Sequence, residues 1–268
     1  MHTETQQPGT PSPASGEGVA RVEYLENGVA VLYLGASSER VVTLTETRMN
    51  SIAEQLQRLR QQKPPGLIIT GPHLEMFTAG ADINVIRDVT DPKIGEQLAR
   101  QGQNLFDEIE SLPFATVAAI SGPCVGGGCE LVLACRYRII SDHKSSSIGL
   151  PETKLGILPG FGGTQRLPRL IGLPKALDII LAGKVLKPKQ ALKYGLVDEV
   201  LHAENLVDRA STILTGEQKP RRSPIPFFER LATSNALVRG FAKRKAESAL
   251  KKQTKGFYPA PPAALEAV

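Results

Sequence analysis

Residues 122–134 read GPCVGGGCELVLA, a glycine-rich turn followed at once by an apolar run that contains Glu130. Glycines 126–128 are unfavourable as helix filler, since each costs about 1 kcal/mol relative to Ala. At a turn between a strand and a helix, however, they let a ligand approach bare backbone, while the first N–H groups of the helix point toward it. Residues 115–120 before it read as a buried strand, so the stretch predicts a helix that begins after the glycines and a site at the junction of the two. The alternative is a tight crossover packed against a neighbouring strand.

A second carboxylate, Glu152, follows the turn formers Gly149 and Pro151, and the chain continues as GILPGFGGTQRLPRL over residues 156–170. Taken alone, Glu152 is the acidic first residue of a helix, and Glu130 is a solvated or paired side chain. Paired carboxylates beside exposed backbone N–H groups are what an enzyme needs to move protons next to a carbonyl that it also polarises. We therefore interpret the two glutamates as a proton-transfer pair with perturbed pKa values.

Strand and helix patterns alternate through the first 200 residues. Residues 20–34 read as two strands around the hairpin signal Asn27-Gly28. Apolar residues at helical spacing predict a helix at 45–62, which Pro64-Pro65 ends before a strand at 66–70. The other predicted elements are a helix with an apolar stripe from Ile94 to Leu112, strands at 137–141 and 196–201, and helices near 164–171, 174–181 and 189–194.

The last part of the chain reads as wholly helical, from Leu206 to about Thr254. The sequence thus predicts an α/β core followed by a helical C-terminal region. No internal repeat at a fixed period is visible.

Positive charge is concentrated near the C-terminus: the net charge is +5, and residues 219–268 hold eleven Lys or Arg against three Glu. Three interpretations stand: solvated helix faces, a counter-charge for a phosphorylated ligand, or a nucleic-acid surface. RNA-binding surfaces usually interleave aromatic residues with basic ones. The aromatic residues available in this region fit helix packing equally well; they are Phe227, Phe228, Phe241, Phe257 and Tyr258.

Several classes of protein are excluded by what the sequence lacks. No stretch reaches about 18 unbroken apolar residues and no secretory signal is present, so no membrane association is expected. Residues 1–18 are polar and rich in turn formers, which predicts a disordered tail. The three cysteines form neither a disulfide framework nor a zinc motif, and a reducing cytoplasm fits them best. Neither GxxxxGK[ST], GxGxxG nor GxSxG occurs, and the four histidines lack HExxH spacing, so no metal site is expected.

Three motifs together resemble the crotonase superfamily, the enoyl-CoA hydratases and isomerases: FTAGADI at 77–83, GPCVGGGCEL at 122–131 and PETKLGILPGFGGTQRLPRLIG at 151–172. The resemblance runs from about residue 20 to residue 205. It is closest to the hydratase half of multifunctional fatty-acid β-oxidation proteins, because Phe161 lies in the glycine loop and residues 243–268 look like that group's linker helix.

This resemblance implies a crotonase-like spiral of repeated ββα units. The implied organisation is a disordered tail at 1–18, a crotonase core at 19–205 and a helical C-terminal region at 206–268. The last of these resembles a linker to a dehydrogenase half that the sequence does not contain.

Carried over residue by residue, the resemblance also implies a site. The N–H groups of Ala81 and Gly127 would form an oxyanion hole for a thioester oxygen, and Glu130 and Glu152 would be the catalytic carboxylates. Gly160, Asp82 and Ile83 would contact water and substrate, and Thr78, Ala79 and Gly80 would line the coenzyme A site. Coenzyme A is part of the substrate, so neither a separate cofactor nor a metal is implied.

The implied activity is enoyl-CoA hydration, the reversible addition of water to a trans-2-enoyl-CoA in fatty-acid β-oxidation. Glu130 would activate water for attack at C3, and Glu152 would protonate C2. Two alternatives stand: a Δ3-Δ2 enoyl-CoA isomerase, alone or as a second activity, and a non-catalytic RNA-binding or scaffold relative. The expected partner is an acyl-CoA thioester, nucleic acid is not expected, and the resemblance implies a homo-oligomer, a trimer or a hexamer, in the cytoplasm.

Two segments depart from the family pattern. The first coenzyme A loop of the family usually reads like RPxxxNAL, whereas this chain has GASSER at 35–40 followed by TETRMN at 45–50. Asn84 stands where the hydratases often carry Lys. A missing cation would weaken coenzyme A binding unless the basic C-terminal region compensates.

Overall fold

The computed structural model describes residues 19–216, 220, 240, 243–248, 250 and 258–268. The predicted disordered tail at 1–18 lies outside these residues. None of the described helices is both long and apolar enough to span a bilayer.

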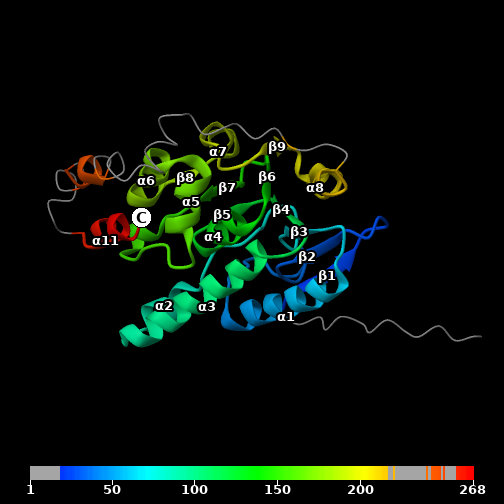
Figure 1. Ribbon diagram of the computed structural model, residues 1–268, viewed down its shortest axis with the longest axis horizontal. Coiled ribbons are helices and arrows are strands. Elements are labelled where there is room, and N and C mark those ends of the chain that lie inside the picture. The colour runs from blue at the N-terminus through cyan, green and yellow to red at the C-terminus, as the bar shows by residue number, and fades with distance from the viewer. Residues whose placement is uncertain (1–18, 217–219, 221–239, 241–242, 249, 251–257) are drawn as a thin grey trace, which may run out of the picture.

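A six-stranded sheet forms the centre of the molecule, with strand order β1-β2-β3-β4-β6-β9 (Figure 1). Only the hairpin of β1 and β2 is antiparallel, and every other neighbouring pair is parallel. The predicted hairpin turn is confirmed, with Gly28 at φ +79°. The strand bounds are β1 Arg21–Tyr24, β2 Ala30–Tyr33, β3 Gly66–Thr70, β4 Ala115–Ile120, β6 Tyr137–Ser141 and β9 Glu199–Leu201.

A second sheet of three very short strands was not predicted. It consists of β5 Pro123–Val125, β7 Ser147–Gly149 and β8 Val185–Leu186. Strands of two or three residues are too short to show the period-2 alternation that reveals a strand in sequence. β5 and β7 are parallel, and an isolated parallel bridge joins Thr78 to Cys124 on the other side of β5.

Most predicted helices are confirmed: α1 Glu46–Gln62, α3 Pro92–Glu110, α4 Gly127–Ala134, α5 Gly163–Ile171, α6 Leu173–Ala182 and α7 Pro188–Tyr194. Thr45 caps α1 by accepting a hydrogen bond from the Arg48 amide. The short elements α2 Ile83–Arg87, η1 Glu152–Leu155 and η2 Ala203–Asn205 are additional.

Two boundaries predicted near residue 200 are corrected by the structure. The strand expected at 196–201 begins only at Glu199, because Asp198 turns toward β6 and its carboxylate accepts a hydrogen bond from the Arg138 amide. The helix expected from residue 206 ends as α8 Leu206–Leu214, and Gly216 follows at φ +84°. Much of the remaining span to residue 254 lies outside the described residues.

The chain repeats a strand-strand-helix unit that the sequence conceals. β4, β5 and α4 form one unit; β6, β7 and η1 with α5 form the next. In both units the first strand joins the large sheet and the second joins the small one. The segment after β3 follows the same course, because Thr78 pairs beside β5 before α2 and α3 begin.

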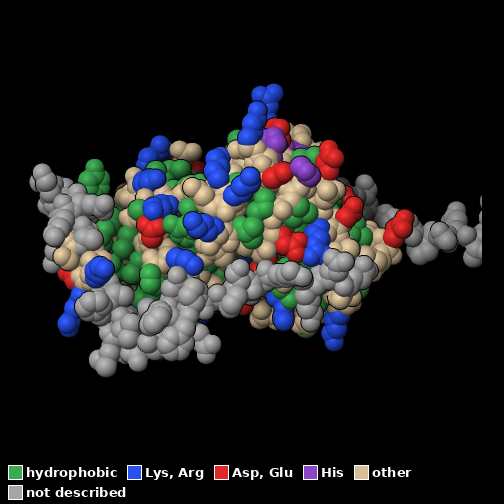
Figure 2. Space-filling model, turned by 90° about the horizontal axis from the view of Figure 1, so that it is seen from above, with side chains coloured by type: hydrophobic (Ala, Val, Ile, Leu, Met, Phe, Trp, Pro, Cys, Tyr) green, Lys and Arg blue, Asp and Glu red, His purple; other side chains and the backbone are tan. Residues whose placement is uncertain are grey.

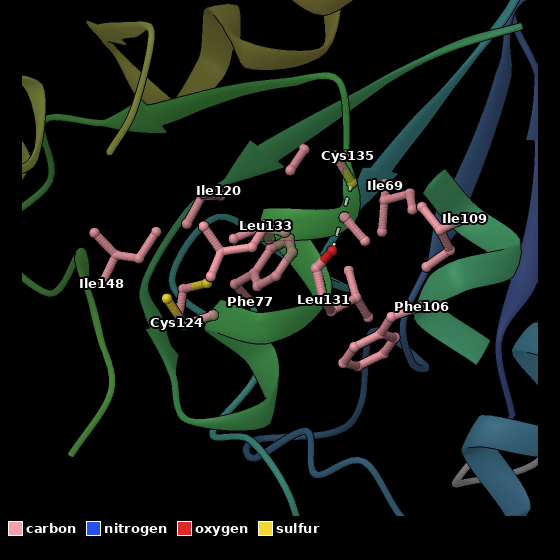
Figure 3. Packing of buried hydrophobic residues seen from close by; sticks show 14 of the residues in the cluster. Ile69, Phe77, Phe106, Ile109, Ile120, Cys124, Leu131, Leu133, Cys135 and Ile148 are labelled. Carbon is pink, nitrogen blue, oxygen red and sulfur yellow. Dashed lines mark hydrogen bonds between the residues drawn. The ribbon is translucent and has the colours of Figure 1, made fainter. Parts of the chain in front are cut away.

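Alternating side chains of the large sheet build two cores. Leu67 and Ile69 of β3 face the core that is covered by α1, α3 and α4, whereas Ile68 faces the core covered by α8 (Figure 1). Figure 3 shows Leu131 and Leu133 of α4 packed among side chains from α3 and the sheets. α8 buries Leu206 and Ala210 against the sheet. At the C-terminus, α11 Ala260–Ala267 packs on α6.

Candidate active site

The glycine run before α4 is required by close contacts. Gly126 has φ +58° and ψ −131°, a conformation that L side chains avoid, and its carbonyl accepts the first helical hydrogen bond, from the Glu130 amide at 3.0 Å. A Cβ on Gly128 would lie 2.4 Å from the Thr78 side chain. The glycines therefore let α4 begin directly against the FTAGADI segment.

The amides of Ala81 and Gly127 flank a common space. A Cβ on Gly127 would lie 3.3 Å from the Ala81 nitrogen, and a Cβ on Gly80 would lie 3.2 Å from the Gly127 nitrogen. Gly127 is the first residue of α4, where an amide has no helical acceptor. Within the described part of the chain, neither the Ala81 N–H nor the Gly127 N–H donates to a protein group.

The register of the short strands explains why these groups meet. Thr78 pairs with Cys124, and Cys124 pairs with Ile148, all in parallel. Three residues further along each segment lie Ala81, Gly127 and, next to Glu152, Pro151. The carboxyl ends of three consecutive units thus meet at one edge, which is where ligands bind in parallel sheets.

Thr78, Ala79 and Gly80 hold Ala81 in place through their own hydrogen bonds. The amides of Thr78 and Ala79 donate to the carbonyls of Pro123 and Val42, and the Gly80 amide donates to the Thr78 hydroxyl. The Thr78 side chain is fully buried and donates to the Val42 carbonyl at 3.0 Å. The Thr78 side chain therefore faces the protein interior, and the prediction that Thr78, Ala79 and Gly80 line a coenzyme A site concerns their backbone.

Glu130 lies in the first turns of α4 and is 2% exposed. Its Oε1 accepts hydrogen bonds from two backbone amides of the next glycine loop, Phe161 at 2.9 Å and Gly163 at 2.7 Å. Burial raises the pKa of Glu130 to about 7, although both amides and the charge of Arg166 act to lower it. At neutral pH this carboxyl can therefore both accept and donate a proton.

Glu152 is the first residue of η1, and the surroundings of its carboxyl differ from those of Glu130. It is 7% exposed, and neither carboxyl oxygen has a hydrogen-bond partner among the described residues. Burial, together with the smaller effect of the nearby charge of Glu130, raises the pKa of Glu152 to about 8; its own backbone amide, which does not have hydrogen-bond geometry, acts weakly to lower it. A Cβ on Gly126 would lie 3.4 Å from Glu152 Oε1, so this acid lies beside the same turn as Glu130.

Two side chains that the sequence did not single out brace the glycine loop from α3 and α5. Gln103 of α3 donates to the Gly160 carbonyl at 2.8 Å, and Arg166 of α5 donates to the Phe161 carbonyl at 3.1 Å. The Phe161 ring packs against Gly102 and meets Phe106 edge to face at 5.7 Å. Neither residue has a distinctive signal in the sequence: Gln103 is a polar residue after Gly102, and Arg166 follows the glycine loop.

The remaining predicted residues lie at the rim. The Asp82 carboxylate accepts a hydrogen bond from the Asn84 amide at 2.9 Å and caps α2, while Ile83 is 56% exposed. In the loop that departs from the family pattern, buried Arg48 forms an ion pair with Glu39 and donates to the Thr43 carbonyl at 2.9 Å. That loop carries Val42, whose carbonyl holds the FTAGADI segment.

A second hollow lies away from the predicted site residues. A groove of about 450 Å³ lies at the C-terminal end of α4, lined in part by Leu133, Arg136 and Arg169, and it contains none of the predicted site residues. No group of three or more His, Cys, Asp or Glu in the described residues is placed to hold a metal ion.

The geometry as a whole suits proton transfer beside a polarised carbonyl. A carboxyl with the lower pKa is ready to act as a base, a neighbouring carboxyl with the higher pKa is ready to act as an acid, and two free amides flank one space. Glu130, Glu152 and Gly127 are buried and Ala81 is half-buried, so hydrogen bonds to a developing charge are stronger here than they would be in water.

Comparisons with known proteins agree with this description. The enoyl-CoA hydratase/isomerase family profile matches residues 25–255. The chain is 43% identical over 242 residues to the fatty acid oxidation complex subunit alpha of Aliivibrio fischeri and 39% identical over 246 residues to that of Shewanella loihica, and these matches cover 90% and 91% of the chain. The chain spans 35% of the length of each of these relatives.

Solved structures show the same fold. An enoyl-CoA hydratase from Bacillus anthracis superposes with a TM-score of 0.68 at 30% identity, over 85% of this chain and 89% of that one. A structure from Geobacillus kaustophilus with the same description superposes with a TM-score of 0.65 at 29% identity, over 92% and 84% of the two chains. The implied crotonase-like spiral of ββα units is therefore confirmed.

Proposed function

The chain belongs to the enoyl-CoA hydratase/isomerase family, and we propose that it adds water reversibly to trans-2-enoyl-CoA thioesters in fatty-acid β-oxidation. The observation that carries this proposal is the contrast between two buried carboxyls at one sheet edge. Glu130 is held by two amides and has a pKa near 7, whereas Glu152 has no partner among the described residues and has a pKa near 8.

The two glutamates divide the proton transfers. Glu130 takes a proton from water as the water oxygen bonds to C3, and Glu152 gives its proton to C2. The resulting 3-hydroxyacyl-CoA leaves Glu130 protonated and Glu152 ionised, and the reverse reaction starts from that state. Gly160, Asp82 and Ile83 are proposed to contact water and substrate, since Gly160 belongs to the loop that holds Glu130 and Ile83 is an exposed apolar residue at the rim.

The amides of Ala81 and Gly127 are proposed to bind the thioester oxygen. Negative charge on that oxygen increases as water adds, so these hydrogen bonds strengthen in the transition state. Coenzyme A enters as part of the substrate, and we propose no separate cofactor. The backbone near Ala79 and Gly80, at the mouth of this space, is proposed to contact it.

Replacing Gly127 tests the oxyanion hole. In Gly127→Ala the new methyl would lie 3.3 Å from the Ala81 nitrogen and 3.2 Å from the Phe161 ring, in the space proposed for the thioester oxygen. We expect kcat/KM to fall by about 100-fold or more. The assay follows the loss of conjugated-thioester absorbance with 2-enoyl-CoA substrates of increasing chain length. A wild-type chain that leaves all of them unhydrated would refute the proposed function.

Two broader proposals follow from the relatives. We propose that residues 19–205 with α8 act as the hydratase unit, and that the rest of the segment 206–268 corresponds to a linker helix in multifunctional relatives. We also propose a homo-oligomer, testable by light scattering, and a cytoplasmic location, which is supported by the free, buried Cys124, Cys129 and Cys135.

RNA binding is the weaker alternative. On the face shown in Figure 2, Lys and Arg side chains lie among apolar, acidic and uncharged surface. If RNA binding were real, its affinity would fall steeply between low and moderate salt.

A further inference from the structure

Arg166 makes a buried connection between α5, α3 and the glycine loop. Its side chain is 8% exposed, although both of its acidic partners are largely exposed. Nε donates to Glu110 Oε2 at 2.9 Å, Nη2 donates to Asp107, and Nη1 donates to the Phe161 carbonyl at 3.1 Å. Asp107 and Glu110 are three residues apart on α3 and so lie on one face of that helix.

The contact with Phe161 leads directly to Glu130. The Phe161 carbonyl accepts from Arg166, while the Phe161 amide donates to Glu130 Oε1, as does the Gly163 amide. Within the described residues, no group donates a hydrogen bond to the other oxygen, Oε2. One oxygen of the carboxyl is thus fixed by the loop that Arg166 holds, and the other is left for a ligand.

We propose that Arg166 is a positioning residue for Glu130 in the hydration reaction, an inference that rests on the proposed function. It holds the turn from Phe161 to Gly163 so that both amides stay on Oε1 and Oε2 points to the attacking water. It also places a positive charge behind the carboxylate, which favours the ionised form that a base requires.

The other ionisable groups around Glu130 do not supply that charge. Glu152 faces it from η1, and Cys129 lies next to it on α4 with a thiol pKa that burial raises well above its usual value. From α3 come Asp107 and Glu110, which contact Arg166. Of these groups and Arg166, only Arg166 is a cation, and its charge lowers the pKa of Glu130 against the larger effect of burial.

The test is Arg166→Met, which keeps much of the side-chain volume and removes the charge. We expect the acidic limb of the kcat/KM profile to move up by about one pH unit, with about a fivefold loss at pH 7 that becomes smaller toward pH 8. A ¹³C-carboxyl NMR titration of Glu130, assigned with Glu130→Gln, should show the same upward shift. The matched control is Arg169→Met, an exposed arginine on the same helix, which should move neither readout.

Removing the negative charge of Asp107 or Glu110 should not raise the pH of the acidic limb, in contrast to Arg166→Met. Asp107→Asn and Glu110→Gln keep the arginine and leave its charge less neutralised, so the acidic limb should stay in place or move down slightly. Arg166→Lys keeps a charge but loses the planar fork, so the rate should fall while the limb stays in place. The Lys variant also keeps the test available if Arg166→Met does not fold.

Three results would overturn the inference: an equal loss at every pH for Arg166→Met, an unchanged Glu130 titration in that variant, or an upward shift in the Lys variant. These differ from failure of the proposed function, in which the wild-type chain itself would not hydrate enoyl-CoA. In that case the NMR titration would still report whether Arg166 controls Glu130.

Discussion

Glu130 and Glu152 are both buried carboxyls at the same sheet edge, yet they are held differently. Glu130 receives two amide hydrogen bonds from a loop that Gln103 and Arg166 brace, whereas Glu152 at the start of η1 has no hydrogen-bond partner among the described residues. Burial raises both pKa values, and the hydrogen bonds keep that of Glu130 lower, about 7 against about 8. The hydrogen bonds and the charge of Arg166 favour the ionised form of Glu130, whereas burial and the neighbouring charge of Glu130 favour the protonated form of Glu152.

The largest effect is expected from replacing Glu130 and Glu152 one at a time, which removes one carboxylate and keeps the other. In Glu130→Gln the side-chain oxygen can still accept the two amide bonds, but the base is gone, and we expect hydration to fall by about 1,000-fold. Isomerisation of a 3-enoyl-CoA, which needs a single base, should largely survive. Glu152→Gln should reduce both activities. Equal loss of both activities in Glu130→Gln would contradict the assigned roles.

Varying the pH sharpens the same comparison. Hydration requires ionised Glu130 and protonated Glu152, so kcat/KM should rise through pH 7 and fall above pH 8. Dehydration requires the other singly protonated form of the pair, so its profile should have the same limbs. The measurement is of initial rates in both directions from about pH 5.5 to about pH 9.5. As a control, enzyme held at each pH is returned to neutral pH and assayed again, which excludes irreversible inactivation. Limbs that differ between the two directions would show that the glutamates do not titrate as a pair.

A smaller effect should follow from loosening only the loop that holds Glu130. Gln103→Leu removes the hydrogen bond to the Gly160 carbonyl and keeps the volume on α3. We expect roughly a tenfold loss of kcat with little change in KM, because the ionisable groups remain. Gln101→Leu, at an exposed position of the same helix, is the control. A loss no larger than that of the control would mean that the loop holds its geometry without Gln103.

The last expected effect is on the free energy of unfolding, and it should make the Glu152→Gln variant more stable than wild type. In the folded state Glu152 keeps its proton up to about pH 8. In the unfolded chain it loses that proton near its usual, lower pKa. The free energy of unfolding should therefore decrease as pH rises between these two values. Glu152→Gln removes this penalty and should be more stable than wild type by several kcal/mol at pH 8.5, since each pKa unit of the shift corresponds to about 1.4 kcal/mol, with little difference at pH 5. Glu130→Gln should gain less. Urea denaturation at the two pH values measures both, and a pH-independent difference would argue against the shifted pKa.

The sequence by itself determined the elements that carry a strong local pattern. The hairpin at Asn27-Gly28, helix α1 and strand β3 are long enough, or have turn residues distinctive enough, to be recognised without tertiary contacts. The glycine run also indicated a junction that needs bare backbone, and the apolar run after Glu130 indicated its burial.

Only the tertiary structure decided how those parts meet. The short strands have two or three residues, so no periodicity reveals them, and it is their pairing between Thr78, Cys124 and Ile148 that brings three distant segments to one edge. The support from Gln103 and Arg166 likewise depends on α3 packing against residues some 60 positions away. Periodicity records which face of an element is buried, whereas register and long-range contacts depend on chain segments that no local pattern connects.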